Sequence, residues 1–229
     1  MRRSEILEVE SAHLIPNEVS GVKLVNALLK LKEKVYWASK KFGAGDREFD
    51  AGTFIVSGKT SKAMRRLIKK YGIDIYRVPA NVRIRGYPLK QPKIGLYNGQ
   101  GIDVWNTRFR AESEYALELL DFPYVSVSDS DVRGGALNVI DVLIVPAGDA
   151  YEILNGWNLR FAWNREPWQM PGEPRGLGDK GMKVIREFLG QGGGYIGIGS
   201  GGGALACKEV GGLVDSEMLG LDVEDKLTY

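Results

Sequence analysis

DVLIVPAG, residues 141–148, is a short and almost wholly apolar run that ends in proline, alanine and glycine. Runs of the same kind precede and follow it, and patterns with helical spacing separate them. Apolar strands that alternate with helices are typical of a parallel sheet covered on both faces. The chain from about Lys93 onward is therefore predicted to be a doubly wound α/β domain. The other runs are KIGLY (93–97), YVSVS (124–128) and YIGIG (195–199), and the helical patterns are ESEYALELL (112–120) and KGMKVIREFLG (180–190).

The first part of the chain predicts a smaller α/β unit. Its two helices have sequence signals for their ends: Ser20 as the N-cap of the first, Thr60 or Ser61 as the N-cap of the second, and Gly72 as the stop of the second. The predicted order is helix 20–34, strand 35–39, strand 49–58, helix 60–72 and strand 74–79.

The segment 79–92 contains several prolines and has weak periodicity, which favours a domain boundary. The sequence thus predicts two domains, a small α/β unit at 1–90 and the doubly wound domain at 91–229.

The charge of the whole chain limits the expected partners. Lys and Arg number 31 against 29 Asp and Glu, a net charge of +2, so no overall field attracts nucleic acid or an anionic membrane. The basic run Lys62–Lys70 has helical spacing. We interpret it as a solvated helix face, with a phosphate-binding patch as the alternative. We therefore expect neither nucleic acid nor a membrane among the partners.

A single cysteine, Cys207, excludes an intrachain disulfide and a cysteine-based zinc site. The N-terminus has no apolar stretch of signal-peptide length, and no segment has the roughly 20 apolar residues of a membrane span. The expected location is the cytoplasm, and neither a metal nor a cofactor is predicted.

Three glycine-rich loops follow the predicted strands of the second domain: YNGQGID (97–103), PAGDAYEILNGW (146–157) and GSGGGALA (199–206). Parallel strands end at one edge of the sheet, where ligands of open α/β sheets bind. We expect these loops to lie together and to bind a small anionic or amide-bearing ligand, with the alternative that they merely survive from an enzymatic ancestor. The predicted ligand-binding residues are Asn98, Gly99, Gly101, Gly148, Asp149, Gly199, Gly201 and Gly202.

Ser200 is the candidate catalytic residue. A polar residue among small ones, between a strand and a helix, has the composition of a nucleophile elbow, and the N–H groups of Gly201 and Gly202 would lie near an oxyanion. Glycines after a buried strand also serve simply to allow a tight turn.

A serine nucleophile needs a base, usually histidine, and the one histidine is His13, far upstream. Asp149, Glu152 or a partner chain would have to replace it, although both carboxylates also fit a helix-capping role. A non-catalytic binding or scaffold module is thus the first hypothesis. A serine-dependent amidohydrolase or acyltransferase is the second.

IGLYNGQGID (94–103), DVLIVPAGDAYEILNG (141–156) and GQGGGYIGIGSGGGALA (190–206) resemble, in order and spacing, the signature loops of a class I glutamine amidotransferase-like domain. The similar domain stands at the N-terminus of some biotin-protein ligases. The resemblance implies a flavodoxin-like sheet. In that family a cysteine follows the last strand, whereas this chain has Gly199 at the corresponding position, so glutaminase chemistry is not implied.

Nearly the whole chain also resembles the region that follows the zinc-protease domain in certain zinc carboxypeptidase-like proteins. VSGVKLVNALLKLKEKVYWA (19–38), FDAGTFIVSG (49–58) and PKIGLYNGQG (92–101) carry this resemblance. The zinc-binding domain itself has no counterpart here, so peptidase activity is not implied.

Both families continue past the last glycine loop with strands that close the sheet, whereas this chain ends at Tyr229. A sheet truncated there leaves an edge uncovered, so we expect a homo-oligomer, most simply a twofold dimer that involves Leu219 and Leu221. The alternative is that the last residues cover that edge themselves. Three of the five tryptophans lie between Trp157 and Trp168, which suggests a lid or a second interface.

Overall fold

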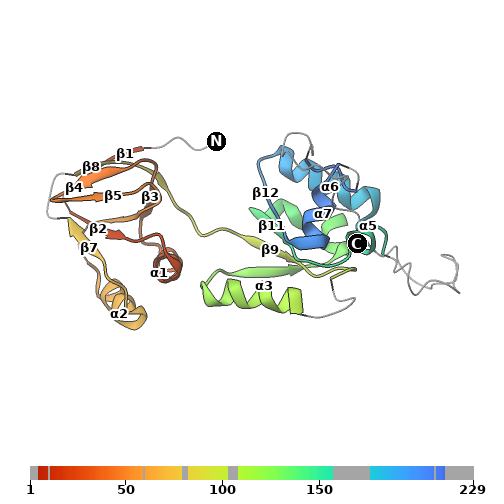
Figure 1. The fold of residues 1–229 in the computed structure, drawn as a ribbon, viewed down its shortest axis with the longest axis horizontal. Helices are drawn as coiled ribbons and strands as arrows, with labels where there is room; N and C mark the ends of the chain where they lie inside the picture. The colour runs from red at the N-terminus through yellow and green to blue at the C-terminus, as the bar shows by residue number, and fades with distance from the viewer. Residues whose placement is uncertain are drawn as a thin grey trace, which may run out of the picture. The chain divides into compact units, whose positions relative to one another are not determined.

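The structure is a computed structural model that describes residues 5–9, 11–58, 60–78, 82–102, 108–156, 176–208 and 210–214. The chain forms two compact units (Figure 1). Unit 1 comprises residues 1–91 with the segment 118–122, and unit 2 comprises residues 92–117 and 123–229. The first division between them falls between Gln91 and Pro92, next to the boundary expected from the sequence.

Unit 1 is built on a six-stranded sheet in the order β1-β8-β3-β6-β2-β7, with antiparallel pairing throughout. A separate hairpin, β4 and β5, completes its strands. The strands are β1 (Glu5–Val9), β2 (Ala12–Ile15), β3 (Val35–Ala38), β4 (Phe42–Ala44), β5 (Arg47–Phe49), β6 (Phe54–Ser57), β7 (Tyr76–Val78) and β8 (Val82–Pro88).

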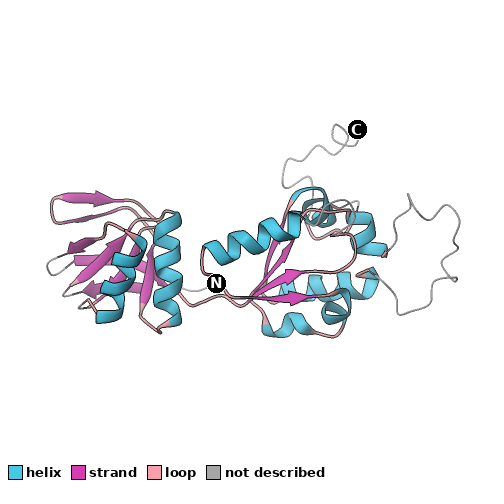
Figure 2. Ribbon diagram, turned by 90° about the horizontal axis from the view of Figure 1, so that it is seen from below, coloured by secondary structure: helices cyan, strands magenta, loops and turns pink. Residues whose placement is uncertain are grey.

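Different elements pack against the two faces of this sheet. Helices α1 (Val19–Lys30) and α2 (Lys62–Tyr71) lie side by side on one face (Figure 2). The β4–β5 hairpin contributes Phe42, Ala44 and Phe49 to a core on the other. Strand β2 shows why both faces need a cover, because Leu14 belongs to the hairpin-side core and the next residue, Ile15, to the helix-side core.

The local signals predicted α2 well and α1 less well. Ser61 is the N-cap of α2, where its side chain accepts a hydrogen bond from the Met64 amide, and Gly72 ends the helix in the left-handed conformation. Helix α1 begins earlier than predicted, with Glu18 as its N-cap, and Ser20 donates its hydroxyl to the Glu18 carboxylate.

Part of the predicted boundary segment is a strand. β8 pairs with both β1 and β3, so residues 82–88 belong inside the sheet. Periodicity missed it because Pro88 ends the strand and Gly86 interrupts the apolar pattern, at a place where a β-carbon would lie 3.2 Å from the Trp37 carbonyl oxygen.

Unit 2 has a four-stranded parallel sheet in the order β10-β9-β11-β12. Numbered within the unit, this order is 2-1-3-4, so the chain first adds a strand on one side of β9 and then on the other. The strands are β9 (Ile94–Tyr97), β10 (Tyr124–Val127), β11 (Val142–Val145) and β12 (Gly194–Gly197).

The main core of unit 2 lies on one face of this sheet. Leu143 and Val145 of β11 pack there against Met182, Ile185 and Phe188. The helical segments of the unit are α3 (Arg108–Leu119), α4 (Asp129–Arg133), the 3₁₀ turn η1 (Ala136–Val139), α5 (Ala150–Asn155), α6 (Gly178–Gly190), the π-helical turn η3 (Gly199–Gly203) and α7 (Ala204–Ala206).

The mixed α/β class and the parallel sheet of the second half are as predicted from the sequence. Among the described residues, no helix has the length and apolar character needed to cross a membrane.

Candidate functional site

The loops that follow β9, β11 and β12 meet at the carboxyl edge of the parallel sheet. The Asp149 amide donates to the Gly101 carbonyl over 2.8 Å, and the Gly202 amide donates to the Pro146 carbonyl over 3.0 Å. The Ser200 hydroxyl donates to the Gly148 carbonyl over 2.9 Å. β9 and β11 are neighbours where the strand order reverses, which is the usual ligand position in open α/β sheets. The structure thus brings the three predicted loops together.

The glycines of these loops are required by contact with one another. A β-carbon at Gly101 would lie 2.6 Å from the Ile153 amide nitrogen. β-Carbons at Gly148, Gly201 and Gly202 would each lie within 3.0 Å of backbone atoms of a neighbouring loop or strand. Backbone fills the space beside these four glycines, so their lack of a side chain is explained by packing between the loops.

Gly199 has a different constraint. Its φ of 57° lies in the left-handed region, and a β-carbon there would lie 2.9 Å from the Ala147 side chain. A nucleophile elbow holds its reactive residue in such a strained turn. Gly199 holds this position, and the exposed Ser200 lies one residue beyond it.

A buried pair anchors the first loop from below. The Tyr97 hydroxyl donates to the Asp129 carboxylate, which also accepts from the Gln100 amide over 3.0 Å. Burial, reinforced by the charge of Asp129, raises the pKa of Tyr97. Gly99 packs directly on this pair. The two side chains are 32 residues apart, and nothing in the sequence marks them as partners.

Asn98 is hydrogen-bonded to other residues of unit 2 through its side chain and its backbone. Its side-chain oxygen accepts a hydrogen bond from the Arg110 guanidinium over 2.7 Å, and that guanidinium also pairs with Glu114 over 3.0 Å. The amide of Asn98 donates to the Val127 carbonyl over 2.8 Å. Asn98 therefore connects the loop after β9 to α3 and to β10.

The two carboxylates after β11 have separate roles. Asp149 is the N-cap of α5 and accepts hydrogen bonds from the amides of Tyr151 and Glu152 over 2.9 and 3.1 Å. Glu152 is only 5% exposed, and its Oε1 has no hydrogen-bond partner among the described residues. Burial, together with the charge of Asp149, raises the pKa of the Glu152 carboxyl.

His13 is a core residue of unit 1. It is 2% exposed on β2, and its Nε2 is hydrogen-bonded to the Thr60 hydroxyl over 2.6 Å. Burial, with the nearby Arg77, lowers the pKa of His13. Its ring is thus enclosed within unit 1. Cys207 is partly buried, with its thiol directed at the Gly203 carbonyl over 3.7 Å.

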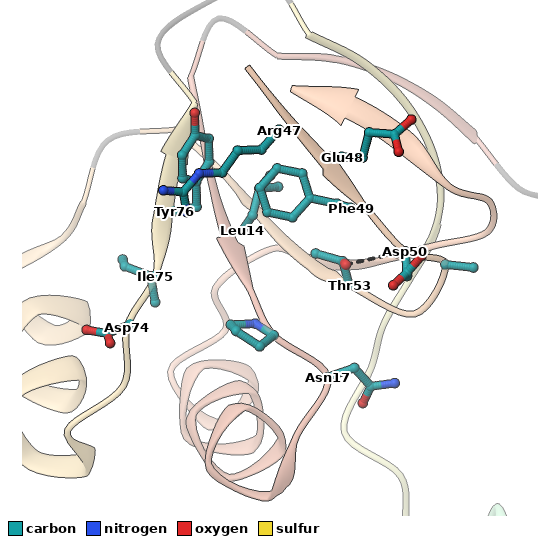
Figure 3. A pocket seen from close by; sticks show the side chains of 12 residues that line it. Leu14, Asn17, Arg47, Glu48, Phe49, Asp50, Thr53, Asp74, Ile75 and Tyr76 are labelled. Atoms are coloured by element: carbon teal, nitrogen blue, oxygen red, sulfur yellow. Dashed lines mark hydrogen bonds between the residues drawn. The ribbon is translucent and has the colours of Figure 1, made fainter. Parts of the chain in front are cut away.

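Unit 1 contains an open cavity of about 580 Å³ between the hairpin, the end of β2 and the segment before β7 (Figure 3). Phe49 and Tyr76 form its aromatic wall, with ring centroids 5.2 Å apart, and Arg47 lies 5.2 Å from the Tyr76 centroid. Asp50 and Asp74 lie at its rim. No sequence pattern indicates this cavity, because its walls come from segments that are far apart in the chain.

Comparison of the chain with known protein families, with curated proteins and with solved structures gave no match. Within the described ranges, no cluster of three His, Cys, Asp or Glu residues has the arrangement to hold a metal ion. The predicted lid at Trp157–Trp168 and the predicted interface residues Leu219 and Leu221 lie outside the described residues.

Proposed function

We propose that unit 2 is a non-catalytic, flavodoxin-like and amidotransferase-like binding module, a pseudoenzyme in chemical terms. Its ligand is a small anionic or amide-bearing molecule that binds at the outer surface of the three loops, beside Gly199 and Ser200. The strand order and the meeting of the loops at the carboxyl edge support this position. A cytoplasmic location is part of the proposal, and the use of a single cysteine supports it.

One observation carries the non-catalytic assignment. The Ser200 hydroxyl donates a hydrogen bond to the Gly148 carbonyl. A backbone carbonyl is too weak a base to remove the serine proton in catalysis, whereas a nucleophilic serine is hydrogen-bonded to a base. The strained position of the turn belongs to Gly199, which has no side chain. Ser200 therefore ties the turn η3 to the loop after β11.

A fluorophosphonate probe tests this assignment directly. The probe labels activated serines, so we expect no labelling of the native protein at neutral pH. Ser200→Ala serves as the test variant and Ser126→Ala, at an exposed position on β10, as its control. Stoichiometric labelling that is lost in Ser200→Ala and kept in Ser126→Ala would show that unit 2 is an enzyme and not a non-catalytic binding module.

Ligand binding is tested separately by NMR of glycine-labelled protein titrated with L-glutamine, acetate and inorganic phosphate. We expect at least one of these probes to shift the signals of Gly199 and its neighbours in a saturable way, and the signal of Gly190 on α6 to stay unchanged. No saturable shift with any of the three would contradict a site for small amides or anions.

A serine-dependent amidohydrolase is the second candidate, and Glu152 is the observation that favours it. Its buried carboxyl has a raised pKa and an Oε1 without a described partner, and its helix α5 packs against η3. Such a carboxylate could take the Ser200 proton only after deprotonation. Fluorophosphonate labelling would then rise with pH through the raised pKa of Glu152, and Glu152→Gln would abolish it.

We also propose that the chain forms a homodimer through the β12 edge of unit 2. β12 is the last strand of the described sheet, and Ile196 and Ile198 are 50% and 40% exposed. Sedimentation equilibrium at micromolar concentration should give a dimer that Ile196→Lys dissociates, whereas Val139→Lys, at another exposed position, should not. A monomeric native protein would disprove the dimer.

A further inference from the structure

The near-neutral total charge conceals a division between the two parts of the chain. Residues 1–91 contain 19 Lys and Arg against 9 Asp and Glu, a net charge of +10. Residues 92–229 contain 12 against 20, a net charge of −8. The segment 118–122 adds Glu118 and Asp121 to unit 1, which leaves that unit at +8. Charge asymmetry of this size points to an anionic partner for the basic part.

Helix α2 concentrates this charge on one surface. Its sequence, KAMRRLIKKY, contains five cations and no acidic residue. All five side chains are exposed, and none forms an ion pair within the part of the chain that the structure describes. These residues are Lys62, Arg65, Arg66, Lys69 and Lys70. We call them the α2 basic face.

The arrangement of the α2 basic face is unfavourable for the isolated helix. Like-charged pairs at i,i+4 each cost about 0.3 kcal/mol in a helix, and α2 contains three of them: Lys62 and Arg66, Arg65 and Lys69, and Arg66 and Lys70. Lys62 and Arg65 also stand in the first turn, where positive charge opposes the helix dipole. Lys69 and Lys70 complement the dipole in the last turn, but no described acidic side chain relieves the repulsion between the cations.

The apolar side of α2 excludes membrane insertion. Met64 is 2% exposed and belongs to the core beneath the two helices, and Leu67 and Ile68 pack against that core. A membrane-surface helix needs its apolar face free to enter the lipid. The exposed side of α2 is thus a purely cationic surface.

The basic surface continues from α2 onto α1. The ammonium groups of Lys23 and Lys70 lie 5.5 and 5.3 Å from the centroid of the Tyr71 ring. Tyr71 thus holds a cation from each helix beside the α2 basic face. Its ring is occupied by these cations, and no exposed aromatic residue of α2 forms a stacking platform of the kind that single-stranded nucleic acids need.

We propose that the α2 basic face and Lys23 dock unit 1 on the phosphate backbone of double-stranded DNA. The five cations extend over eight helical steps, about 12 Å, and duplex DNA presents one negative charge per about 1.7 Å of its axis. Lysine and arginine contact phosphates, and α2 exposes no asparagine or glutamine to read adenine. The proposal places these cations on phosphates and not on bases, so the docking is independent of base sequence and strongly dependent on salt.

The test is fluorescence anisotropy of the full chain with a labelled 20-bp DNA duplex, from 25 to 200 mM salt. The variant Arg65→Gln/Arg66→Gln/Lys69→Gln removes three charges from α2. Its matched control, Lys40→Gln/Lys41→Gln/Arg47→Gln, removes three charges from the hairpin side of the same unit. Circular dichroism melting confirms that both variants remain folded.

Native protein should bind the duplex with a dissociation constant in the micromolar range at low salt. The α2 variant should bind about tenfold more weakly. The plot of log K against log salt has a negative slope, and its magnitude should decrease by about 0.9 for each phosphate that the variant no longer neutralises. The hairpin-side control should keep the native slope.

Four outcomes would overturn the proposal. These are no binding to the duplex at low salt, equal weakening in both triple variants, stronger binding to single-stranded RNA or poly-glutamate than to the duplex, and binding to phosphatidylserine vesicles without binding to DNA. Equal weakening in both variants would show that DNA binding depends on the total charge of unit 1 and not on α2. The last two would assign the surface to another class of partner.

Discussion

The loop cluster of unit 2 and the α2 basic face of unit 1 differ in how far their interactions are satisfied within the chain. In the loop cluster, Ser200, Asp149 and Asn98 all have hydrogen-bond partners in neighbouring segments, and neighbouring backbone fills the space beside the glycines. On α2, five cations face solvent without a described ion pair. The loop cluster has the more conspicuous sequence motifs. The α2 basic face has more charged groups without a described partner.

This difference separates two reasons for an unusual composition. Glycine runs arise when segments pack backbone against backbone, and this requires no ligand. A row of like charges opposes folding of the helix that contains it, so packing gives no reason for it. The proposal for α2 thus rests on groups whose interactions the described chain leaves unsatisfied, and Glu152 Oε1 is the corresponding group in unit 2.

The largest effect is expected from Gly202→Ala in the loop cluster. The new β-carbon would collide with the Val145 carbonyl of β11, which is held in the sheet and cannot move away. We expect a loss of about 3 kcal/mol in the free energy of unfolding, measured by urea denaturation. Gly190→Ala at the exposed end of α6 is the control, since nothing lies within 4 Å of its β-carbon position. If both variants are equally stable, the loops are less tightly packed than described.

Tyr97→Phe should have the next largest effect. It removes a hydrogen bond from the buried Asp129 carboxylate and leaves the Gln100 amide as a donor. The expected loss is about 1 to 3 kcal/mol, seen as a lower melting temperature. Tyr115→Phe, 66% exposed on α3, should leave the melting temperature unchanged. A neutral Tyr97→Phe would show that the first loop does not depend on this pair.

Glu152→Gln should give a smaller effect that depends on pH. Because the folded-state pKa of Glu152 lies above its ordinary value of 4.5, the stabilising contribution of its protonated form is complete below about pH 4.5 and is lost as pH rises through the folded pKa. The neutral variant should therefore gain roughly 1 kcal/mol relative to native protein at pH 7 and little at pH 4. Urea midpoints at pH 4, 5.5 and 7 measure this, with Glu112→Gln on α3 as control. A difference that is constant with pH would contradict a buried, uncompensated carboxylate.

Arg66→Glu in α2 should have the smallest effect on stability and, like Glu152→Gln at pH 7, should be stabilising. It replaces two like-charged i,i+4 pairs by attractive pairs with Lys62 and Lys70, and loss of the two repulsive pairs alone should raise the free energy of unfolding by about 0.6 kcal/mol. The same change should weaken DNA binding. Lys40→Glu is the control for the change in net charge. A variant that is destabilised and binds DNA normally would mean that the α2 basic face serves folding.

The sequence by itself determined the parts of the structure that depend on local signals. The sequence offered Thr60 or Ser61 as the start of α2 and Gly72 as its end, and the apolar runs of the second half identified its parallel strands, because caps and periodicity act over a few residues. The position of the three loops also followed from the sequence, since all parallel strands end at one edge. The charge division was present in the sequence too, because the predicted boundary after residue 90 separates the same charges as the boundary after Gln91 in the structure.

The tertiary structure alone decided the features that join distant residues. Pairing with β1 and β3 made residues 82–88 a strand, and close approach of backbones assigned the loop glycines to packing. The Tyr97–Asp129 pair and the enclosure of His13 by Thr60 depend on contacts across 32 and 47 residues. Such contacts have no local sequence signal, because each side chain only acquires its partner when strands far apart in the chain are brought into register.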